Sequence, residues 1–124
     1  MKFLLENEGD LLLVDIDDRG IELKIHVFRL DENERKWVKF ENLGGRVLFI
    51  GLELSFSASV SDLRVPKGNC IIFIDDVFDH MNMEDMSIVH LDQNGGHLSV
   101  LHDNPEYCNL FWPPPEWIVK SHLR

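Results

Sequence analysis

The sequence predicts an all-β fold of antiparallel sheets, and three observations carry this prediction. Short apolar, β-branched runs recur along the chain, turn-forming Gly, Asp and Asn residues separate them, and no stretch has the sustained 3.6-residue apolar period of an amphipathic helix. The chain has 124 residues, of which 44% are hydrophobic. This length suits one domain with a modest core, so we expect a single domain over residues 1–124.

Residues 9–51 predict a first four-stranded unit. The runs Gly9–Ile16 and Ile21–Leu30 flank a turn rich in Asp and Gly, a third run centres on Trp37, and Val47–Gly51 follows a double-glycine corner as the fourth. Four strands in about forty residues is the spacing of a propeller blade. We expect the large ring of Trp37 to pack between sheets or blades, where its truncation would cost about 3 to 5 kcal/mol.

Residues 70–102 predict a second blade-like unit, and residues 52–69 a linker between the two. The linker should hold a short strand, Ser55–Ser59, and a helical turn that ends near Leu63. Asn94-Gly95 is a strong hairpin signal, because both positions tolerate positive φ. The strands expected in the second unit are Cys70–Asp75, Ser87–Leu91 and His97–Leu101.

Two blade-like sheets cannot close a propeller by themselves, so their edges and faces need a cover. We therefore expect a partial propeller that is closed either as a compact sandwich or by association with other chains. Association would give a homo-oligomer or an obligate complex, with the Phe111–Trp117 arm and strands such as Val47–Ile50 or Cys70–Ile74 buried between chains.

An arm rich in tryptophan and proline, residues 105–124, follows the second unit. Three consecutive prolines hold its centre in a rigid extended conformation that cannot enter a central strand. The arm either packs across a neighbouring blade or docks in an aromatic-lined groove of another protein. Its candidate protein-binding residues are Tyr107, Phe111, Trp112, Pro113, Pro114, Pro115 and Trp117.

Charge is distributed unevenly along the chain. The formal net charge is -10, and between Gly68 and Val119 there are nine acidic residues but no Lys or Arg. Such a field repels phosphate and argues against nucleic acid as a partner. The acidic residues either keep the sheets soluble or attract a protein with a basic surface. The candidate docking residues in this region are Asp75, Asp76, Asp79, Glu84 and Asp85.

The residues that could carry chemistry form no recognised catalytic or metal-binding motif. The acidic loop around His80 lacks the ligand spacing of a calcium loop, and His90, His97 and His102 alternate with apolar residues as a polar strand face would. Cys70 lies in an apolar run and is expected to be a buried free thiol. We therefore expect no enzymatic activity, no cofactor and no metal. A metal-dependent hydrolase that uses these acidic and histidine groups is the remaining alternative.

Four motifs follow one another along nearly the whole chain. They are V-F-R-L-D-E-x-E-x-K-W-V-x-x-x-x-L-G-x-R-x-L-F-I-G (Val27–Gly51), SFSASVSDL (Ser55–Leu63), KGNCIIFIDD (Lys67–Asp76) and FWPPPEWI (Phe111–Ile118). Together they resemble the plant DUF295 family, whose full-length members are F-box proteins with a β-propeller-like body. The resemblance implies a protein similar to the substrate receptors of cullin-type ubiquitin ligases, and it offers no catalytic residues. The F-box itself is absent here, so no contact with a ligase adaptor is assigned, and we expect a fragment or a truncated relative.

These observations lead us to expect a non-enzymatic protein-interaction module that resembles the substrate-recognition part of a plant F-box protein. It would act as a truncated regulator or competitor of full-length relatives. The alternative is a purely structural propeller fragment without independent activity. No run approaches the roughly twenty apolar residues of a membrane span, so we expect no membrane partner and a cytoplasmic or nuclear location.

Overall fold

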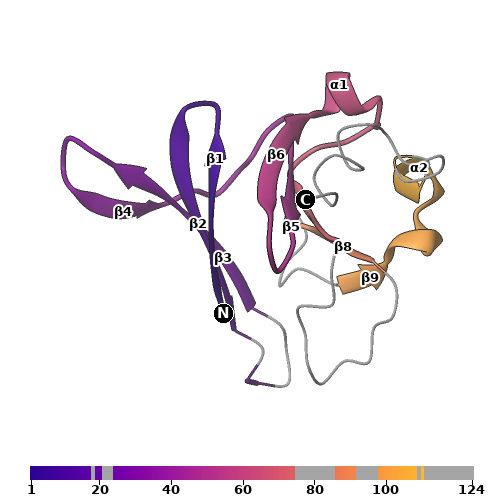
Figure 1. Cartoon of the computed structure of the whole chain (residues 1–124), viewed down its shortest axis with the longest axis horizontal. Helices are drawn as coiled ribbons and strands as arrows, with labels where there is room; N and C mark the ends of the chain where they lie inside the picture. Colours follow the sequence, from indigo (N-terminus) through magenta and orange to yellow (C-terminus); the bar gives the residue numbers. More distant parts are fainter. Residues whose placement is uncertain (18, 21–23, 75–85, 92–97, 109, 111–124) are drawn as a thin grey trace.

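A computed structural model describes residues 1–17, 19–20, 24–74, 86–91, 98–108 and 110. Its strands form two sheets, which we call the first sheet, with the order β1-β2-β3-β4, and the second sheet, with the order β6-β5-β7-β8-β9 (Figure 1). The helical segments of the described residues are only three or four residues long. The predicted all-β class is therefore confirmed. None of these helices has the length or the apolar character needed to cross a membrane.

The first sheet is an antiparallel meander in which each strand pairs with the next along the chain. Between its first two strands, Glu8 and Gly9 have φ values of 52° and 86°, as a two-residue hairpin turn with two positive φ angles requires. The strand expected at residues 9–16 is present, and so is the described part of the one expected at 21–30, since residues 21–23 lie outside the described residues; the strand that precedes them was not expected. The bounds are β1 (Lys2–Asn7), β2 (Asp10–Asp17), β3 (Lys24–Asp31) and β4 (Lys36–Lys39).

The second sheet is mixed, because its two central strands, β5 and β7, run parallel while all other neighbours are antiparallel. The chain returns from β6 to β7 through one helical turn, α1 (Val60–Leu63). Ser59 begins this turn by accepting a hydrogen bond on Oγ from the amide of Asp62 at 3.1 Å, as an N-cap serine does. The strand bounds are β5 (Arg46–Ile50), β6 (Ser55–Ser59), β7 (Cys70–Phe73), β8 (Ser87–His90) and β9 (Leu98–Val100).

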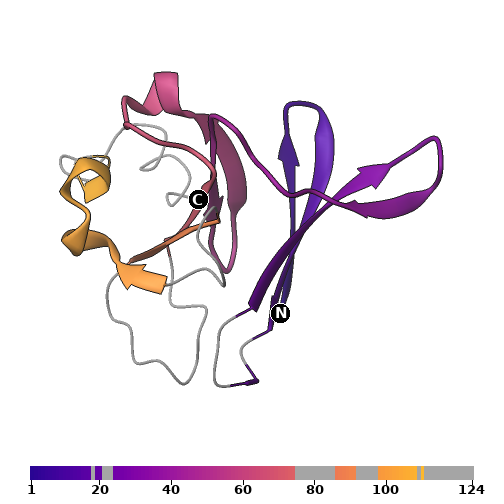
Figure 2. The same cartoon turned by 180° about the vertical axis from the view of Figure 1, so that it is seen from behind.

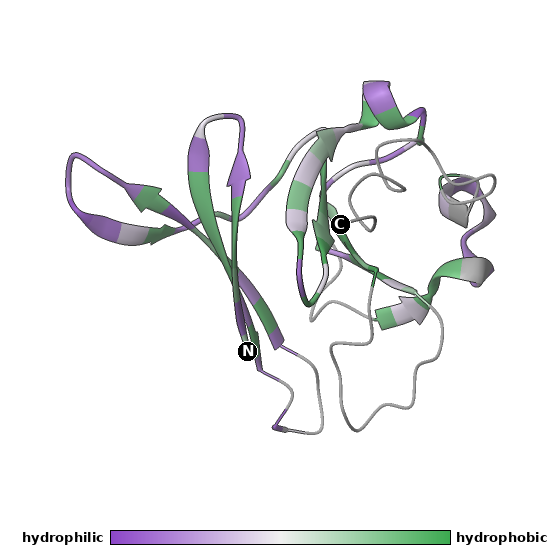
Figure 3. Ribbon diagram, viewed as in Figure 1, coloured by the Kyte–Doolittle hydropathy of each residue, from purple (hydrophilic) through white to green (hydrophobic). Residues whose placement is uncertain are grey.

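The second sheet is the middle layer of the described structure. In both views it lies between the first sheet and the helical segments α2 (Pro105–Cys108) and η1 (Leu101–Asp103) (Figures 1 and 2). All residues of Val47–Ile50 and Cys70–Phe73 are 0% exposed, as expected of continuous apolar strands that are covered on both faces. The tips of the β1–β2 and β3–β4 hairpins of the first sheet, in contrast, are hydrophilic (Figure 3).

Each face of the second sheet contributes to a separate hydrophobic core. The core between the sheets combines Leu5, Leu12, Val14, Ile16 and Val27 of the first sheet with Leu43, Leu48, Ile50, Ile71, Phe73 and Val89. The core beneath the helical segments consists of Val47, Phe49, Leu63, Val65, Cys70, Ile72, Ile88, Leu101, Tyr107 and Leu110. The first sheet thus uses only one of its faces, which we call the inner face, to cover the second sheet.

This topology corrects three expectations. Val47–Ile50 was expected as the fourth strand of the first unit, but it forms β5 inside the second sheet, and Lys2–Asn7 supplies the strand that the first sheet needs. A run that is apolar at every position suits a strand with two covered faces. Two strands, Val47–Ile50 and Cys70–Ile74, were expected at an interface between chains. They correspond to β5 and β7, each of which has a paired neighbour on both sides within the second sheet. Residues 52–69 are not a linker between units either, although the strand and the helical turn expected within them are confirmed.

One asparagine ties the chain together at the entrance to the second sheet. Asn69, which has φ 54° and is 8% exposed, accepts a hydrogen bond on Oδ1 from the amide of Leu43 at 2.8 Å. Its own amide donates to the carbonyl of Arg46, and its carbonyl accepts from the amide of Leu91, both at 2.9 Å. One residue therefore satisfies backbone groups before β5 and after β8, which explains the GN pair that precedes β7 in the sequence.

Gly68, next to this asparagine, is predicted to tolerate no side chain. A Cβ there would lie 2.5 Å from the carbonyl oxygen of Gly44 and 2.9 Å from the amide nitrogen of Arg46, and both are backbone atoms. We expect Gly68→Ala to lower the free energy of unfolding by about 3 kcal/mol or more. Gly9→Ala is the control: Gly9 has φ 86° but open space around it, so the loss should be only about 1 to 2 kcal/mol. Urea denaturation that gives the two variants the same midpoint would show that the close approach is wrong.

Candidate protein-interaction surface

Most of the residues that the sequence singled out for protein binding lie outside the described residues. This applies to Asp75, Asp76, Asp79, Glu84, Asp85, Phe111, Trp112, Pro113, Pro114, Pro115 and Trp117, and their role stays a prediction. Tyr107 is described and is 1% exposed. Its hydroxyl donates to the carbonyl of Lys67 at 2.7 Å, and its ring lies edge-on to His90 with the ring centres 5.8 Å apart. In this structure Tyr107 lies in α2 and packs in the core between the helical segments and the second sheet, so its ring is not open to a partner.

The structure describes only some of the residues that were proposed as metal ligands. His80 and His97 lie outside the described residues, and of the proposed histidine face only His90 has a described side chain. In the described part of the chain, no three His, Cys, Asp or Glu side chains are grouped closely enough to hold a metal ion. Cys70 is buried and forms no disulfide, as expected for this thiol.

A partly buried polar junction joins the first sheet to the second. Arg46, at the start of β5, donates from Nε to Oδ1 of Asn7 at 3.0 Å and from Nη2 to Oγ of Ser57 at 2.8 Å. The hydroxyl of Ser57 in turn donates to the carbonyl of Glu6 at 3.3 Å. Asn7 is 4% exposed and the Arg46 side chain 20%. The end of β1 is therefore held against β5 and β6, on the same side of the first sheet as the shared hydrophobic core.

One face of the first sheet points away from the second sheet, and we call it the outer face. It carries a cluster of apolar side chains. Leu4, Leu13 and Phe28 are directly paired neighbours across β1, β2 and β3, and Leu30 pairs with Trp37 across β3 and β4. Because side chains alternate along a strand, these residues all lie on one side of the sheet. With Leu11, the apolar cluster of the outer face comprises Leu4, Leu11, Leu13, Phe28, Leu30 and Trp37.

The outer face is exposed to a degree that is unusual for side chains of this size. Leu4 is 58% exposed, Trp37 40% and Leu11 38%, while the other three are partly buried. Isolated exposed apolar residues are common on protein surfaces, but a contiguous cluster marks an interaction surface. The sequence contained a signal for this cluster, because the run of leucines at 11–13 is apolar on both sides of a strand.

Trp37 is therefore not packed between sheets, and that expectation is wrong. In the register, Val38 pairs with Arg29 and Arg29 with Leu12, so Val38 and not Trp37 lies on the side of the buried Leu12. The 3 to 5 kcal/mol expected for truncating Trp37 applied to a buried ring and does not apply to one that is 40% exposed.

Charged side chains continue the outer face beyond the apolar cluster, toward the N-terminus. Asp15 pairs with both Lys2 and His26, and Asp17 pairs with Lys24. Opposite charges thus stand beside each other in neighbouring strands, an arrangement that stabilises a sheet.

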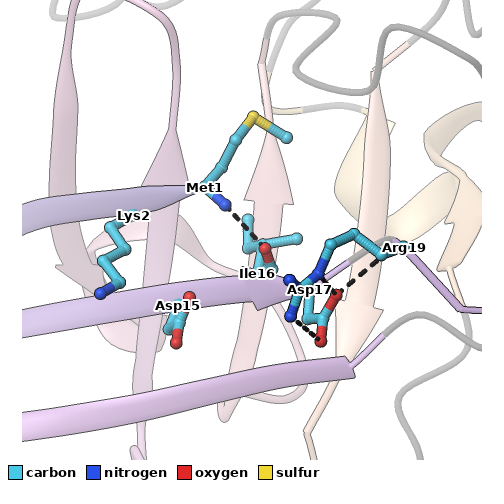
Figure 4. A pocket seen from close by; sticks show the side chains of 6 residues that line it. All are labelled: Met1, Lys2, Asp15, Ile16, Asp17 and Arg19. Carbon is cyan, nitrogen blue, oxygen red and sulfur yellow. Dashed lines mark hydrogen bonds and ion pairs between the residues drawn. The ribbon is translucent and has the colours of Figure 1, made fainter.

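An open pocket of about 430 Å³ lies at this charged end (Figure 4). Arg19 donates to Asp17 from Nε at 3.0 Å, from Nη2 at 3.2 Å and from its backbone amide at 3.1 Å. The N-terminal amine of Met1 donates to the carbonyl of Ile16 at 2.8 Å. The pocket lining is Met1, Lys2, Asp15, Ile16, Asp17 and Arg19. Its charges largely neutralise one another, so it offers no strong site for an ion.

The contact between Arg19 and Asp17 affects the pKa of the Asp17 carboxyl, which leads to a prediction. The side-chain hydrogen bonds from Arg19, followed by the bond from its amide, hold the pKa of the Asp17 carboxyl at about 2, below its ordinary value of 3.8. A lowered carboxyl pKa favours the folded state above the ordinary value, and that contribution is lost as the pH falls through about 2. In Arg19→Gln, the carboxyl of Asp17 should titrate closer to 3.8 when followed by NMR. Lys24→Gln is the control and should shift the midpoint far less, because Lys24 is the weakest of the causes. An unchanged midpoint in Arg19→Gln would contradict the contact.

Comparison with known proteins places the chain in a family. The family model described as the KIB1-4 beta-propeller matches residues 1–100. F-box protein At2g17036 of Arabidopsis thaliana is 32% identical over 98% of the chain and 35% of its own length, and F-box protein SKIP23 of the same plant is 34% identical over 99% of the chain and 37% of its own length. A putative F-box/kelch-repeat protein, At5g24040, is 30% identical over 77% of the chain. No solved structure gives a significant match.

The chain thus spans about a third of the length of the F-box proteins that it resembles. The expected kinship with plant F-box proteins and with a propeller fold is confirmed, while the narrower DUF295 assignment remains a resemblance. With a family model that covers residues 1–100 of 124 and an all-β architecture of two packed sheets, the chain belongs to the KIB1-4 β-propeller family.

Proposed function

We propose that this chain is a non-enzymatic protein-interaction module whose docking surface is the outer face. The observation that carries the proposal is the cluster of six apolar side chains on a side of the first sheet that no described residue covers, three of which are 38% to 58% exposed. Burial of apolar surface is the main driving force of protein association, and large exposed clusters on a soluble domain favour binding to another protein.

The relatives suggest which class of partner to seek. Two of them are named F-box proteins, and the chain resembles the substrate-recognition part of such proteins. We propose that it binds the same kind of target protein, as a truncated regulator or competitor of full-length relatives, in the cytoplasm or nucleus. A net charge of -10 favours a partner with a basic surface, whose association would slow as salt screens the attraction.

The alternative is a structural propeller fragment without activity of its own. The same cluster would then be the face that packs on another blade of a longer protein, since blades in a propeller cover one another. The two functions differ in whether the isolated chain captures a specific protein through the outer face.

Affinity capture from Arabidopsis extract separates these functions. The wild-type chain, Leu4→Ser/Trp37→Ser and Leu52→Ser would serve as baits, and recovered proteins would be quantified by mass spectrometry. Leu52 is 66% exposed but lies after β5 in the second sheet, outside the outer face, so it is a matched control. We expect partners that bind the wild type and Leu52→Ser, and that bind the double variant at least about tenfold more weakly, because each buried apolar side chain contributes roughly 1.5 to 3 kcal/mol.

Two outcomes would count against the proposal. Partners that bind the double variant as well as they bind the wild type would place docking elsewhere on the chain. Baits that all recover no specific protein would favour the structural alternative.

A further inference from the structure

We propose that the apolar cluster of the outer face binds an amphipathic α-helix of a partner protein, and that this helix crosses the four strands of the first sheet with its N-terminus over β1. The inference rests on the proposed function, because it names the structural element that the same surface would bind. It follows from the shape of the apolar cluster, from its polar borders and from the two charges at its ends.

The apolar cluster is a narrow band that runs across the strands. Its side chains occupy only two neighbouring rows of the outer face, and each strand contributes one or two of them. One row holds the paired neighbours Leu4, Leu13 and Phe28, and the next row holds Leu11, Leu30 and Trp37. Two rows are about 7 Å apart along the strands, and three strand spacings give the band a length of roughly 14 Å.

Polar groups border the band on both sides. Toward the N-terminus of the chain, the next row of the outer face holds Lys2, Asp15 and His26. On the other side lie the tips of the β1–β2 and β3–β4 hairpins, which are hydrophilic (Figure 3). A partner that covered more than the two apolar rows would have to remove charged groups from water, which is costly. The band therefore suits a partner that is narrow along the strand direction.

An α-helix laid along the band has the required dimensions. Its diameter with side chains is about 10 to 12 Å, which covers two rows, and about ten residues at 1.5 Å each span the length of the band. The apolar stripe of an amphipathic helix occupies only one side of it, with apolar residues at i, i+3, i+4 and i+7. Its polar side would stay in water above the charged borders of the band.

A β-strand or a second sheet fits the first sheet less well. Packed sheets interdigitate along the length of their strands, so a second sheet would also bury the charged row next to the band. A single added strand needs a free edge, and the edge strand β4 carries Lys36 and Lys39, both exposed, which discourages such an addition. At the opposite edge, the carbonyl of Glu6 in β1 already accepts a hydrogen bond from Ser57 of β6.

Two charges at the ends of the band favour one direction of the helix. Glu6 lies beside Leu11 at the β1 end, and Lys39 lies beside Phe28 at the β4 end. Both side chains are exposed, and neither forms an ion pair with a residue of the described part of the chain. A helix carries partial positive charge at its N-terminus and partial negative charge at its C-terminus. The favourable direction thus places the N-terminus over Glu6 and the C-terminus over Lys39.

The acidic character of the whole chain acts at longer range than this contact. The net charge of -10 would speed the approach of a partner protein with a basic surface. On the outer face itself, Asp15 stands beside Lys2 and Asp17 beside Lys24, so the local field is largely neutral. The contact would therefore depend on the apolar band, whereas the rate of association would depend on the net charge.

Selection from a peptide library tests the helix directly. Random peptides of about sixteen residues, long enough to form a helix, would be displayed and selected on the full wild-type chain. Peptides that also bind Leu4→Ser/Trp37→Ser would be removed. We expect the recovered peptides to share apolar residues at i, i+3, i+4 and i+7, and to gain helical circular dichroism on binding. Selection on Leu52→Ser, the control outside the outer face, should recover the same sequences.

The direction of the helix is tested with one recovered peptide. A nitroxide label at its N-terminus should broaden the amide NMR signals of β1 more than those of β4. At low salt, Glu6→Lys and Lys39→Glu should each raise the dissociation constant of the peptide about two- to fivefold, as expected of a charge near a helix terminus. Lys36→Glu is the matched control, because Lys36 lies in the same strand but on the opposite side of the sheet, and it should leave the dissociation constant unchanged.

Three results would overturn the inference. They are recovered peptides that are rich in proline or apolar at alternate positions, peptides that bind without gaining helical structure, and a label that broadens β4 more than β1. A library that yields no peptide dependent on Leu4 and Trp37, while affinity capture yields proteins that require them, would refute the helix and leave the proposed function intact. Failure of both experiments to yield such a ligand would refute both.

Discussion

The second sheet has to be covered on both faces, and the rest of the structure depends on this constraint. Val47–Ile50 and Cys70–Phe73, its central strands, expose no surface at all. Leaving either face in water would cost about 25 cal/mol for each Å² of apolar surface, in a chain whose whole stability is expected to be only about 5 to 15 kcal/mol. One cover is the first sheet, and the other consists of the short helical segments that hold Leu63, Leu101 and Tyr107.

The asymmetry of the first sheet follows from its role as a cover. Its inner face supplies Leu5, Leu12, Val14, Ile16 and Val27 to the shared core, and the hydrogen bonds of Arg46 with Asn7 and Ser57 hold its first strand against β5 and β6. The same strands carry Leu4, Leu13 and Phe28 on the opposite side, where nothing in the described part of the chain covers them. The surface that we propose for docking is thus the consequence of a sheet that is apolar on both sides but packed on only one.

Local patterns in the sequence predicted the strands better than their partners. The runs that became β2, β3, β7 and β8 are apolar and bounded by turn residues, and they were identified correctly. The run Val47–Ile50 was identified as a strand but assigned to the wrong sheet, because its parallel pairing with β7 joins residues more than twenty positions apart and leaves no local trace. Lys2–Asn7 was missed because a short apolar segment at the chain start gives little information on its own.

The candidate surface was predictable only in part. In the KWVK segment, either Trp37 or Val38 could face the core, and the size of the tryptophan favoured the wrong one. The register with Leu30 and Arg29, which the sequence does not reveal, decides between them. The doubly apolar character of residues 11–13 was visible, but it could not show which side would remain uncovered.

The central claim is that the two sheets share one core and unfold together. Native-state hydrogen exchange followed by NMR tests it most directly, because it measures an opening free energy for each amide. We expect the slowest amides of β2 in the first sheet and of β5 and β7 in the second to exchange with the same free energy and the same dependence on denaturant. If β2 exchanged through a separate opening while β5 and β7 stayed protected, the first sheet would not be a required cover of the second, and the account would be contradicted.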